Sequence, residues 1–595
     1  MTSYEAPLAD MRFLFHGMGN LEAVNRLAGL EDATADLVDA VLDEADKLAR
    51  ERLAPCNQTA DRTGGAKFEN GVVRTSQGWT EAYDAFVAGG WNSVPFEPEF
   101  GGQGLPWLVA VALQEIWQSA NMSWALCPLL TQSAVELLTA HGSHQQKSTW
   151  LPKLVSGEWT GTMNLTEPGA GSDVGALKCR AEPAGDHFLI RGQKIYITYG
   201  EHDLTENIVH MVLARTPNAP AGTKGISLFI VPKFLVDEDG TPGKRNDLHC
   251  VSLEEKLGIH GSPTCVMAYG DNEGAVGYLV GEENRGMEYM FTMMNNARIS
   301  VGLQGVSIAE RAYQQARAYA RERIQGKPPT DGSGAIIGHP DVRRMLLTMR
   351  SMTEAMRALT YDLAAMLDIS KRHAEEPWRT YADRRVGLLT PVVKAWCTDV
   401  GVEVASIGVQ IHGGMGYIEE TGAAQHYRDA RIAPIYEGTN GIQAIDLVTR
   451  KLLRDDGTAA LEYIEELQAL INGMNARAEE DIAIIRHHFA AAVDALDNAT
   501  QWLLDAGKDD LAEALAVASP YLRLFGTVAG GAMLARAALH CVTTLQDTSQ
   551  ERTELRDKLT VARFYAEQVL TQAPGLATTI AAGGKTALAL SEDRF

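Results

Sequence analysis

Cysteine, basic charge and long apolar runs are all scarce in this sequence of 595 residues. Its seven cysteines are far apart and form no CxxC pair, which argues against a disulfide framework or a zinc site and indicates a reducing compartment. No run of about 18 unbroken apolar residues occurs, so no membrane span is expected. The opening segment MTSYEAPLADMRFLFHG lacks the apolar run of a signal peptide and the Arg/Ser bias of a transit peptide. We therefore expect a cytoplasmic protein.

Acidic residues outnumber basic ones by 76 to 53, and the formal net charge is -23. Because the acids are spread along the chain, most of the surface repels polyphosphates, and neither nucleic acid nor an anionic membrane is expected as a partner. A phosphorylated cofactor can still bind through a few Arg side chains and backbone N–H groups. With 45% hydrophobic residues the composition is that of a globular protein, and its length indicates roughly three or four domains.

Helical and strand-like patterns alternate along the chain. Residues 31–154 are mostly helical, with Leu37, Ala40, Val41, Ala45 and Leu48 expected on one apolar face. Short β-type runs follow, and then a long helix whose Met287, Met290, Met294, Val301 and Ile308 form a stripe that is more typical of a core than of a cofactor site. The predicted fold is mainly α with a central β domain. The predicted domains are an N-terminal helical domain (1–160), a middle β domain (161–285), a helical bundle (286–455) and an extra C-terminal helical domain (456–595).

The segment TMNLTEPGAGSDVGAL (162–177) carries a glycine motif that resembles a dinucleotide-binding loop. Its spacing, GxGxxxG, is one residue too long, and it precedes β-type sequence instead of the helix that a Rossmann fingerprint must open. The NAD interpretation therefore fails. Two interpretations stay open: Thr166 and Ser172 line a loop that approaches a flat polar ring, or the segment is a surface β-turn.

The segment APIYEGTNGIQ (433–443) places a lone carboxylate, Glu437, in apolar and glycine-rich company. Thr439 or Asn440 is expected to cap the helix that follows, with Ile442, Ile445 and Leu452 facing inward. Glu437 would lie just ahead of that helix, where the dipole lowers the pKa of a carboxyl group and burial raises it.

Five segments together resemble, in the same order, the signature segments of acyl-CoA dehydrogenases. They are LTEPGAGSDVGAL, KIYIT (194–198), ARISVGLQGVSIAERAYQQARAYARER (297–323), QIHGGMGYIEE (410–420) and RDARIAPIYEGTNGIQ (428–443). The resemblance covers roughly residues 30–455, and the extra helical domain is similar to that of a long bacterial branch. It implies an N-terminal helical domain, a middle β-barrel domain and a C-terminal four-helix bundle.

The resemblance also implies a reaction. The protein would bind FAD and form the α,β double bond of an acyl-CoA, with Glu437 as the base and an electron-transferring flavoprotein as the electron acceptor. FAD sites shared between subunits imply at least a homodimer. Because of the resemblance to the long bacterial branch, we expect 3-methylthiopropanoyl-CoA as the substrate in preference to a generic fatty acyl-CoA. An acyl-CoA oxidase stays an alternative, whereas a nucleic-acid-associated relative would need a basic C-terminal surface and this one is acidic.

Site residues follow from the same resemblance. Those expected to contact substrate are Ser172, Arg298, Tyr436 and Gly438. Those expected to contact FAD are Leu165, Thr166, Gly171, Ser172, Tyr196, Ile197, Thr198, Arg323, Gln325, Gln410, Gly413, Gly414, Thr439, Asn440 and Gly441. No metal is expected.

Three positions carry qualifications. Tyr196 replaces the commoner Trp over the flavin, and the segment of Arg323 and Gln325 lacks the usual Phe. Arg298 could instead be a solvated helix residue. A subgroup places its base just before this Arg, but Ala297 cannot abstract a proton, so the base assignment returns to Glu437.

Overall fold

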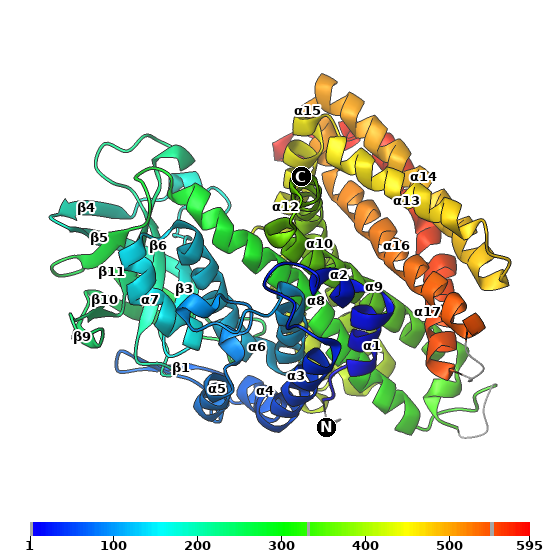
Figure 1. The fold of residues 1–595 in the computed structure, drawn as a ribbon, viewed down its shortest axis with the longest axis horizontal. Helices are drawn as coiled ribbons and strands as arrows, with labels where there is room; N and C mark the ends of the chain where they lie inside the picture. Colours follow the sequence, from blue (N-terminus) through cyan, green and yellow to red (C-terminus); the bar gives the residue numbers. More distant parts are fainter. Residues whose placement is uncertain (1–3, 330–333, 548–551) are drawn as a thin grey trace.

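The structure is a computed structural model that describes residues 4–329, 334–547 and 552–595. Figure 1 shows a β domain on one side, a set of long helices in the centre and a second set of helices on the opposite side. The predicted class, mainly α with a central β domain and an additional C-terminal helical domain, is confirmed. The exact domain boundaries stay predictions.

The N-terminal helices surround the long buried α6 (Trp107–His141), which has a kink at Asn121, where φ is −158° and ψ is 89°. The other N-terminal helices are α3 (Ala35–Leu48), α4 (Ala54–Arg62), α5 (Trp79–Ala88) and α7 (His144–Ser156). Thr34 caps α3, as its hydroxyl accepts from the N–H of Leu37. The predicted apolar face of α3 is wrong in part: Ala45 is buried and Val41 and Leu48 pack against the core, but Leu37 and Ala40 are exposed, and Val38 and Leu42 are buried instead. The hydrophobic periodicity of α3 does not distinguish two neighbouring faces of similar hydrophobicity, and packing against α6 selects the face that is buried.

The main sheet of the β domain has the strand order β10-β11-β5-β12-β7-β6-β3, and β4 pairs with β5 beside this path. Two further strands, β8 (Phe234–Val236) and β9 (Pro242–Arg245), form a separate sheet. The β3–β6 pair is parallel, and the other strand pairs among the described residues are antiparallel. Between Cys265 and Met267 of β11 the register with β5 shifts, so that Ile195 and Tyr196 of β5 form a bulge. The strands of the main sheet are β3 (Thr160–Asn164), β4 (Arg180–Ala184), β5 (His187–Thr198), β6 (Ile208–Ala214), β7 (Ser227–Pro232), β10 (Leu248–Leu253), β11 (Thr264–Tyr269) and β12 (Ala275–Leu279).

The central bundle is built on α8 (Gly286–Glu322), α9 (Pro340–Arg372) and α10 (Glu376–His412). Helices α8 and α9 pack against α6, and α10 packs on α8 and α9. Glycines let α8 and α10 approach closely: a Cβ at Gly305 would lie 2.1 Å from the carbonyl oxygen of Cys397. The stripe predicted on α8 is in the core, with Met290, Met294 and Val301 buried. Two short helices, α11 (Ala423–Ala430) and α12 (Asn440–Lys451), follow α10 and pack on it.

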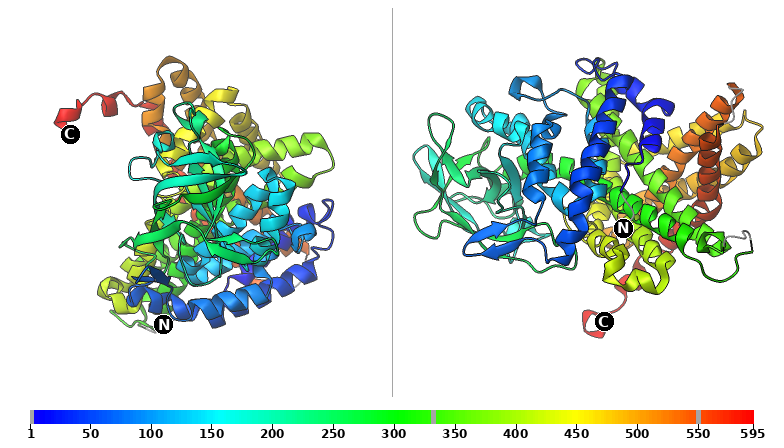
Figure 2. Two further views of the ribbon diagram at one scale, coloured as in Figure 1. Left: turned by 90° about the vertical axis from the view of Figure 1, so that its left-hand side faces the viewer. Right: turned by 90° about the horizontal axis from the view of Figure 1, so that it is seen from below.

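The C-terminal domain packs against this bundle through α16 (Ala518–Asp547) and α17 (Thr553–Gln568). Its other long helices are α13 (Thr458–Met474) and α14 (Glu480–Asp509), and in Figure 2 the final residues stand away from them. Within the described residues, Ala518–Gln546 is the one helical stretch long and apolar enough to cross a membrane. Of its most apolar window, 67% is buried inside the protein, which is typical of a core helix.

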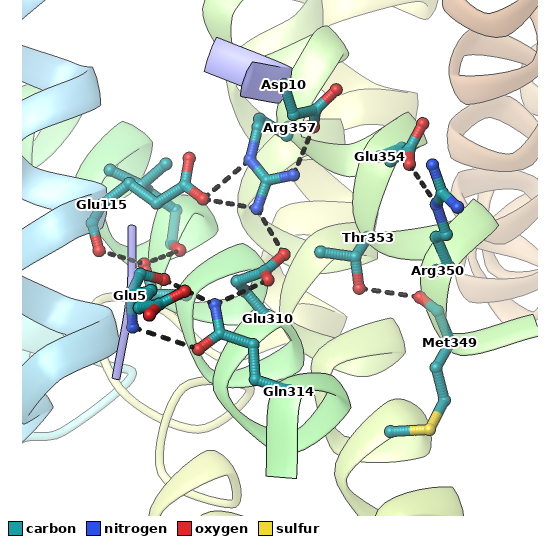
Figure 3. A network of polar contacts seen from close by, with 12 residues as sticks. Glu5, Asp10, Glu115, Glu310, Gln314, Met349, Arg350, Thr353, Glu354 and Arg357 are labelled. Atoms are coloured by element: carbon teal, nitrogen blue, oxygen red, sulfur yellow. Dashed lines mark hydrogen bonds and ion pairs between the residues drawn. The ribbon is translucent and has the colours of Figure 1, made fainter. Parts of the chain in front are cut away.

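A buried network of charges joins distant parts of the chain (Figure 3). The guanidinium of Arg357 on α9 contacts Glu115 of α6 at 2.7 Å and Glu310 of α8 at 2.8 Å. It also contacts Asp10 of the N-terminal segment, and Asp10 in turn contacts Lys558 of α17. The N-terminal segment, the bundle and the C-terminal domain therefore meet at one set of ion pairs.

Candidate functional site

The site predicted around Glu437 is a left-handed turn between α11 and α12. Glu437 has φ +56° and Gly438 has φ +83°, and this conformation is strained for a residue other than glycine. Gly438 also has no room for a side chain, because a Cβ there would lie 2.7 Å from Nε2 of Gln443. The sequence placed a turn here, and the structure shows that two consecutive residues adopt the left-handed conformation.

The predicted cap of α12 is confirmed at Thr439, whose hydroxyl accepts from the N–H of Ile442 at 3.4 Å. The predicted inward face is wrong in part: Leu452 is buried, but Ile442 and Ile445 are exposed. The buried positions of α12 near the turn are instead Gln443 and Ala444. The fully buried amide of Gln443 donates to the carbonyl oxygens of Glu437 and Gly438, so hydrogen bonding to the turn sets which face points inward.

Positive charge surrounds the turn. Arg298 of α8 is 8% exposed and its Nε donates to the carbonyl oxygen of Glu437 at 3.4 Å, so the solvated-helix interpretation is wrong. Lys394 of α10 is fully buried and donates to the carbonyl oxygen of Gly438 at 2.8 Å. Burial raises the pKa of the Glu437 carboxyl group, and the charges of Arg298 and Lys394 oppose that rise. The glutamate is a partly buried acid with two cations beside it.

The segment that leads into the turn is anchored on the β domain. Asp429 of α11 accepts from the N–H of Ile259 at 2.5 Å, and burial raises the pKa of Asp429 to about 6. Next to it, Arg428 forms an ion pair with Asp61 of α4 at 2.6 Å. A Cβ at Gly258 would lie 2.6 Å from the carbonyl of Arg428, so the β-domain loop and α11 are in close contact. The turn therefore has a fixed position relative to the sheet.

The glycine loop lies beside strand β5. The carbonyl of Thr166 accepts from the N–H of Ile195 at 2.9 Å, which ties the start of the loop to the bulge in β5. At the tip, Gly171 and Ser172 are exposed, and a Cβ at Gly171 would meet no atom within 4 Å. Tyr196 has φ +61° and its side chain is 60% exposed. Further along β5, Ile197 is buried and Thr198 is half-buried. A loop with open space above its glycines and an aromatic side chain on the adjoining strand can accommodate a flat ring.

An ion pair that sequence reasoning missed holds this loop. Lys194 of β5 is fully buried and contacts the carboxylate of Glu167 at 2.8 Å and the carbonyl of Leu165 at 2.9 Å. The same carboxylate accepts from the N–H groups of Lys178 and Cys179 at the other end of the loop. Both residues stand inside quoted motifs, yet their pairing depends on the bulge, which has no clear sequence signal.

The predicted residues near the ends of α8 and α10 form a separate group. Arg323, Gln325, Gln410, Gly413 and Gly414 are exposed. The helix ends lie together, because the ring of His412 stacks on Tyr319 with centroids 4.4 Å apart. At 1.5 Å per residue, Gln410 lies ~24 Å along α10 from Lys394, so the group is remote from this chain's own Glu437.

His412 itself is buried and hydrogen-bonds the carbonyl of Gly408. In the parts of the chain that the structure describes, no cluster of three His, Cys, Asp or Glu side chains could hold a metal ion.

Beyond Tyr436 the space between α8 and α6 is filled with amides and hydroxyls. The phenol of Tyr436 donates to Oε1 of Gln304 on α8. One turn away on either side of Gln304, Ser300 donates to Gln114 of α6 at 2.7 Å and Ser307 donates to Gln118 at 3.2 Å. The buried amides and hydroxyls of α6 and α8 therefore bond to one another behind Tyr436.

The comparisons with known proteins agree with this architecture. Three acyl-CoA dehydrogenase family models match in chain order, for the N-terminal domain (residues 37–158), the middle domain (162–271) and the C-terminal domain (284–453). The chain belongs to the acyl-CoA dehydrogenase family. A fourth model, described as acetyl-CoA dehydrogenase C-terminal like, matches residues 463–591 and covers the extra helical domain of this family member.

Two curated relatives and one solved structure show how far the likeness extends. A 3-methylmercaptopropionyl-CoA dehydrogenase of Ruegeria pomeroyi is 49% identical over 96% of both chains. A butyryl-CoA dehydrogenase of Syntrophomonas wolfei is 33% identical over 94% of this chain and 93% of its own. An acyl-CoA dehydrogenase of Bacillus anthracis, complexed with FAD, is 19% identical, with a TM-score of 0.74 over 94% of this chain and 90% of its own. The last shows the shared fold, including the additional domain.

Proposed function

We propose that this acyl-CoA dehydrogenase oxidises 3-methylthiopropanoyl-CoA to 3-methylthioacryloyl-CoA, with Glu437 as the base and FAD as the cofactor. The relative from Ruegeria pomeroyi, 49% identical along almost the whole chain, carries the substrate assignment. The polar network between Tyr436 and α6 supports a short acyl chain, because an apolar chain that extends past Tyr436 would meet buried amides and hydroxyls.

The residues around the glycine loop fit FAD. Leu165, Thr166, Gly171 and Ser172 would hold the flavin edge from the loop, while Tyr196, Ile197 and Thr198 would cover one ring face from β5. Thr439, Asn440 and Gly441 would close the other end of the site. When bound, FAD supplies the acceptor for the β-hydrogen, which leaves the substrate as hydride.

This chain's own residues carry the proton half of the reaction. In the proposed mechanism the Glu437 carboxylate removes the α-proton, whose acidity the thioester raises. Gly438, which has no side chain, would let the backbone of the turn approach the thioester closely, and Tyr436 and Ser172 would contact the substrate. Burial raises the pKa of Glu437, and the charges of Arg298 and Lys394 oppose that rise and so favour the carboxylate form that the base requires.

We also propose an assembly and an acceptor. The exposed group of Arg323, Gln325, Gln410, Gly413 and Gly414 would contact the FAD of a neighbouring subunit, which implies a homodimer or a larger homo-oligomer. Electrons would pass to an electron-transferring flavoprotein in the bacterial cytoplasm.

The substrate is tested by anaerobic bleaching of the bound flavin with a panel of acyl-CoAs. We expect 3-methylthiopropanoyl-CoA to reduce the flavin with a higher kcat/KM than propanoyl-, butanoyl- or octanoyl-CoA. Each methylene in an apolar pocket is worth only about 1–3 kcal/mol, so neighbouring chain lengths should differ by roughly ten- to two-hundredfold. The proposal fails if butanoyl-CoA and longer substrates bleach the flavin and the methylthio compound does not. Oxygen consumption compared with reduction of an electron-transferring flavoprotein separates a dehydrogenase from an oxidase.

A further inference from the structure

Lys394 has a position that a purely structural residue would not require. It lies in the middle of α10 with no exposed surface, yet its ammonium group contacts neutral oxygens: the carbonyl of Gly438 at 2.8 Å and Oδ1 of Asn440 at 2.9 Å. A buried cation without a carboxylate in contact is costly to a fold. Such a group is typical of a site where the charge has a use.

The oxygens that Lys394 contacts belong to the turn that carries Glu437. In this turn the carbonyl of Glu437 accepts from Arg298 and the carbonyl of Gly438 accepts from Lys394. Since a peptide group is planar, fixing these two carbonyls also fixes the direction of the N–H groups on the opposite side of each peptide. The strained left-handed conformation at Glu437 is thereby held by donors from two different helices.

A second set of contacts fastens the same turn to α10. The side-chain amide of Asn440 donates to the carbonyl of Ala395 at 3.1 Å, to Thr398 at 2.9 Å and to Asp399 at 2.7 Å. Its oxygen accepts from Lys394. One turn of α10 thus saturates the side chain of the first residue of α12, and Lys394 is the cationic member of that turn.

The charges that face Lys394 come from three elements. They are Glu437 in the turn, Asp399 on α10 itself and Arg298 on α8, and Arg298 in turn faces Asp446 of α12. Burial lowers the pKa of Lys394 to about 7, Glu437 and Asp399 oppose that change, and Arg298 adds to it. Lys394 and Glu437 therefore stabilise each other's charged form.

We propose that Lys394 is a positioning residue of the reaction, which holds the Glu437–Gly438 turn in its productive conformation and supplies a second positive charge beside the Glu437 carboxylate. This inference rests on the proposed role of Glu437 as the base. It adds a residue that lies mid-helix, 43 positions before Glu437, outside the segments whose resemblance identified the site.

The test compares Lys394→Met and Lys394→Arg with Lys558→Met as a matched control. Lys558 is another well-buried lysine, but it contacts Asp10 and Glu354 at the C-terminal domain. Each holoenzyme is reduced anaerobically with the best acyl-CoA of the panel across pH 5.5 to 9, and its FAD content and melting temperature are recorded. The same substrate is given to Glu437→Gln, so that failure of the base assignment shows itself separately.

In Lys394→Met we expect FAD to be retained, flavin reduction to slow by at least about tenfold, and the acidic limb of the pH profile to move up by about one unit, because Glu437 loses a neighbouring cation. Lys394→Arg should keep the acidic limb within about half a unit of wild type. Lys558→Met should melt at a lower temperature with an unchanged limb.

A Lys394→Met enzyme whose rate and limb match those of wild type, while Glu437→Gln is inactive, would overturn the inference. If Lys394→Met does not fold with FAD, Lys394→Arg decides: an acidic limb displaced by about a full unit in that variant contradicts the role of the charge.

Discussion

At the scale of single residues, the sequence predicts the carboxylate and the helix cap of the turn around Glu437, but not the cations that surround it. The lone carboxylate before a capped helix is readable from APIYEGTNGIQ, and Thr439 caps the helix as predicted. The cations beside it are not readable in the same way. Arg298 was expected at the site only from the family resemblance, and Lys394 was not expected there. The two come from different helices and reach the turn together only when α8 and α10 are packed side by side. The predicted roles of all these residues stay predictions.

The base assignment is tested by Glu437→Gln. The carboxamide is nearly isosteric, so the variant should fold and keep FAD, but it cannot accept the α-proton. We expect flavin reduction by the best acyl-CoA to slow by ~10²–10⁴-fold, the usual contribution of a positioned base. Stopped-flow absorbance of the bound flavin under anaerobic conditions measures this rate, and the melting temperature serves as the folding control. A variant with a tenth of the wild-type rate would rule out Glu437 as the base.

At the scale of elements, the existence and type of the helices and of the β domain were predictable, whereas the face that each helix turns toward the core was not. Periodicity located α3, α8 and the β domain, but the wrong face was assigned to α3 at Leu37 and to α12 at Ile442 and Ile445. In both helices a tertiary contact chose between similar faces: packing on α6 in the first, and hydrogen bonds from Gln443 to the turn in the second. The bulge that exposes Tyr196 was likewise not predictable from the sequence, because it arises from a register shift between β5 and β11.

The conformation of the glycine loop should depend on the pair of Lys194 and Glu167. Glu167→Gln removes the negative charge and leaves Lys194 buried without its partner, so the loop loses its link to β5. We expect the Kd for FAD to rise by about tenfold or more, measured by flavin fluorescence titration of the apoprotein. Glu182→Gln, at an exposed position on β4, is the matched control and should leave the Kd unchanged.

The same pair has a defined pH dependence. Burial would raise the pKa of Glu167, but Lys194 and the N–H groups of Lys178 and Cys179 lower it overall. The carboxylate therefore contributes stability above the unfolded pKa of about 4.3, and that contribution is lost as the pH falls through the lower folded pKa. An equal Kd for Glu167→Gln and wild type at neutral pH would show that the loop does not need the ion pair.

At the scale of the whole molecule, the order of the domains was predictable but their connection was not. Changes in hydrophobic period along the chain indicated helices, a β domain, a bundle and further helices, and that order is confirmed. The charge network around Arg357 unites residues hundreds of positions apart, from Asp10 to Lys558, and no local pattern encodes such a meeting. Figure 3 shows the acids of three elements converging on one guanidinium.

The network predicts how the C-terminal domain and the N-terminal segment depend on the bundle. Arg357→Met leaves Glu115, Glu310 and Asp10 without their shared cation, and breaking a buried pair in this way typically costs about 3–5 kcal/mol. The control is Arg384→Met, which removes an exposed ion pair with Glu462 between the bundle and the C-terminal domain and should cost about 0–1 kcal/mol.

The effect of Arg357→Met should also vary with pH. Burial already raises the pKa of Glu115, and Arg357 opposes that rise, so the variant should raise it further. A carboxyl group whose folded pKa exceeds its unfolded value destabilises the fold increasingly as the pH rises through that interval. Arg357→Met should therefore lose more stability at pH 8 than at pH 5.5, when urea unfolding is followed by far-UV circular dichroism. Equal midpoints for Arg357→Met, Arg384→Met and wild type at pH 8 would mean that the ion pairs of Arg357 do not stabilise the fold.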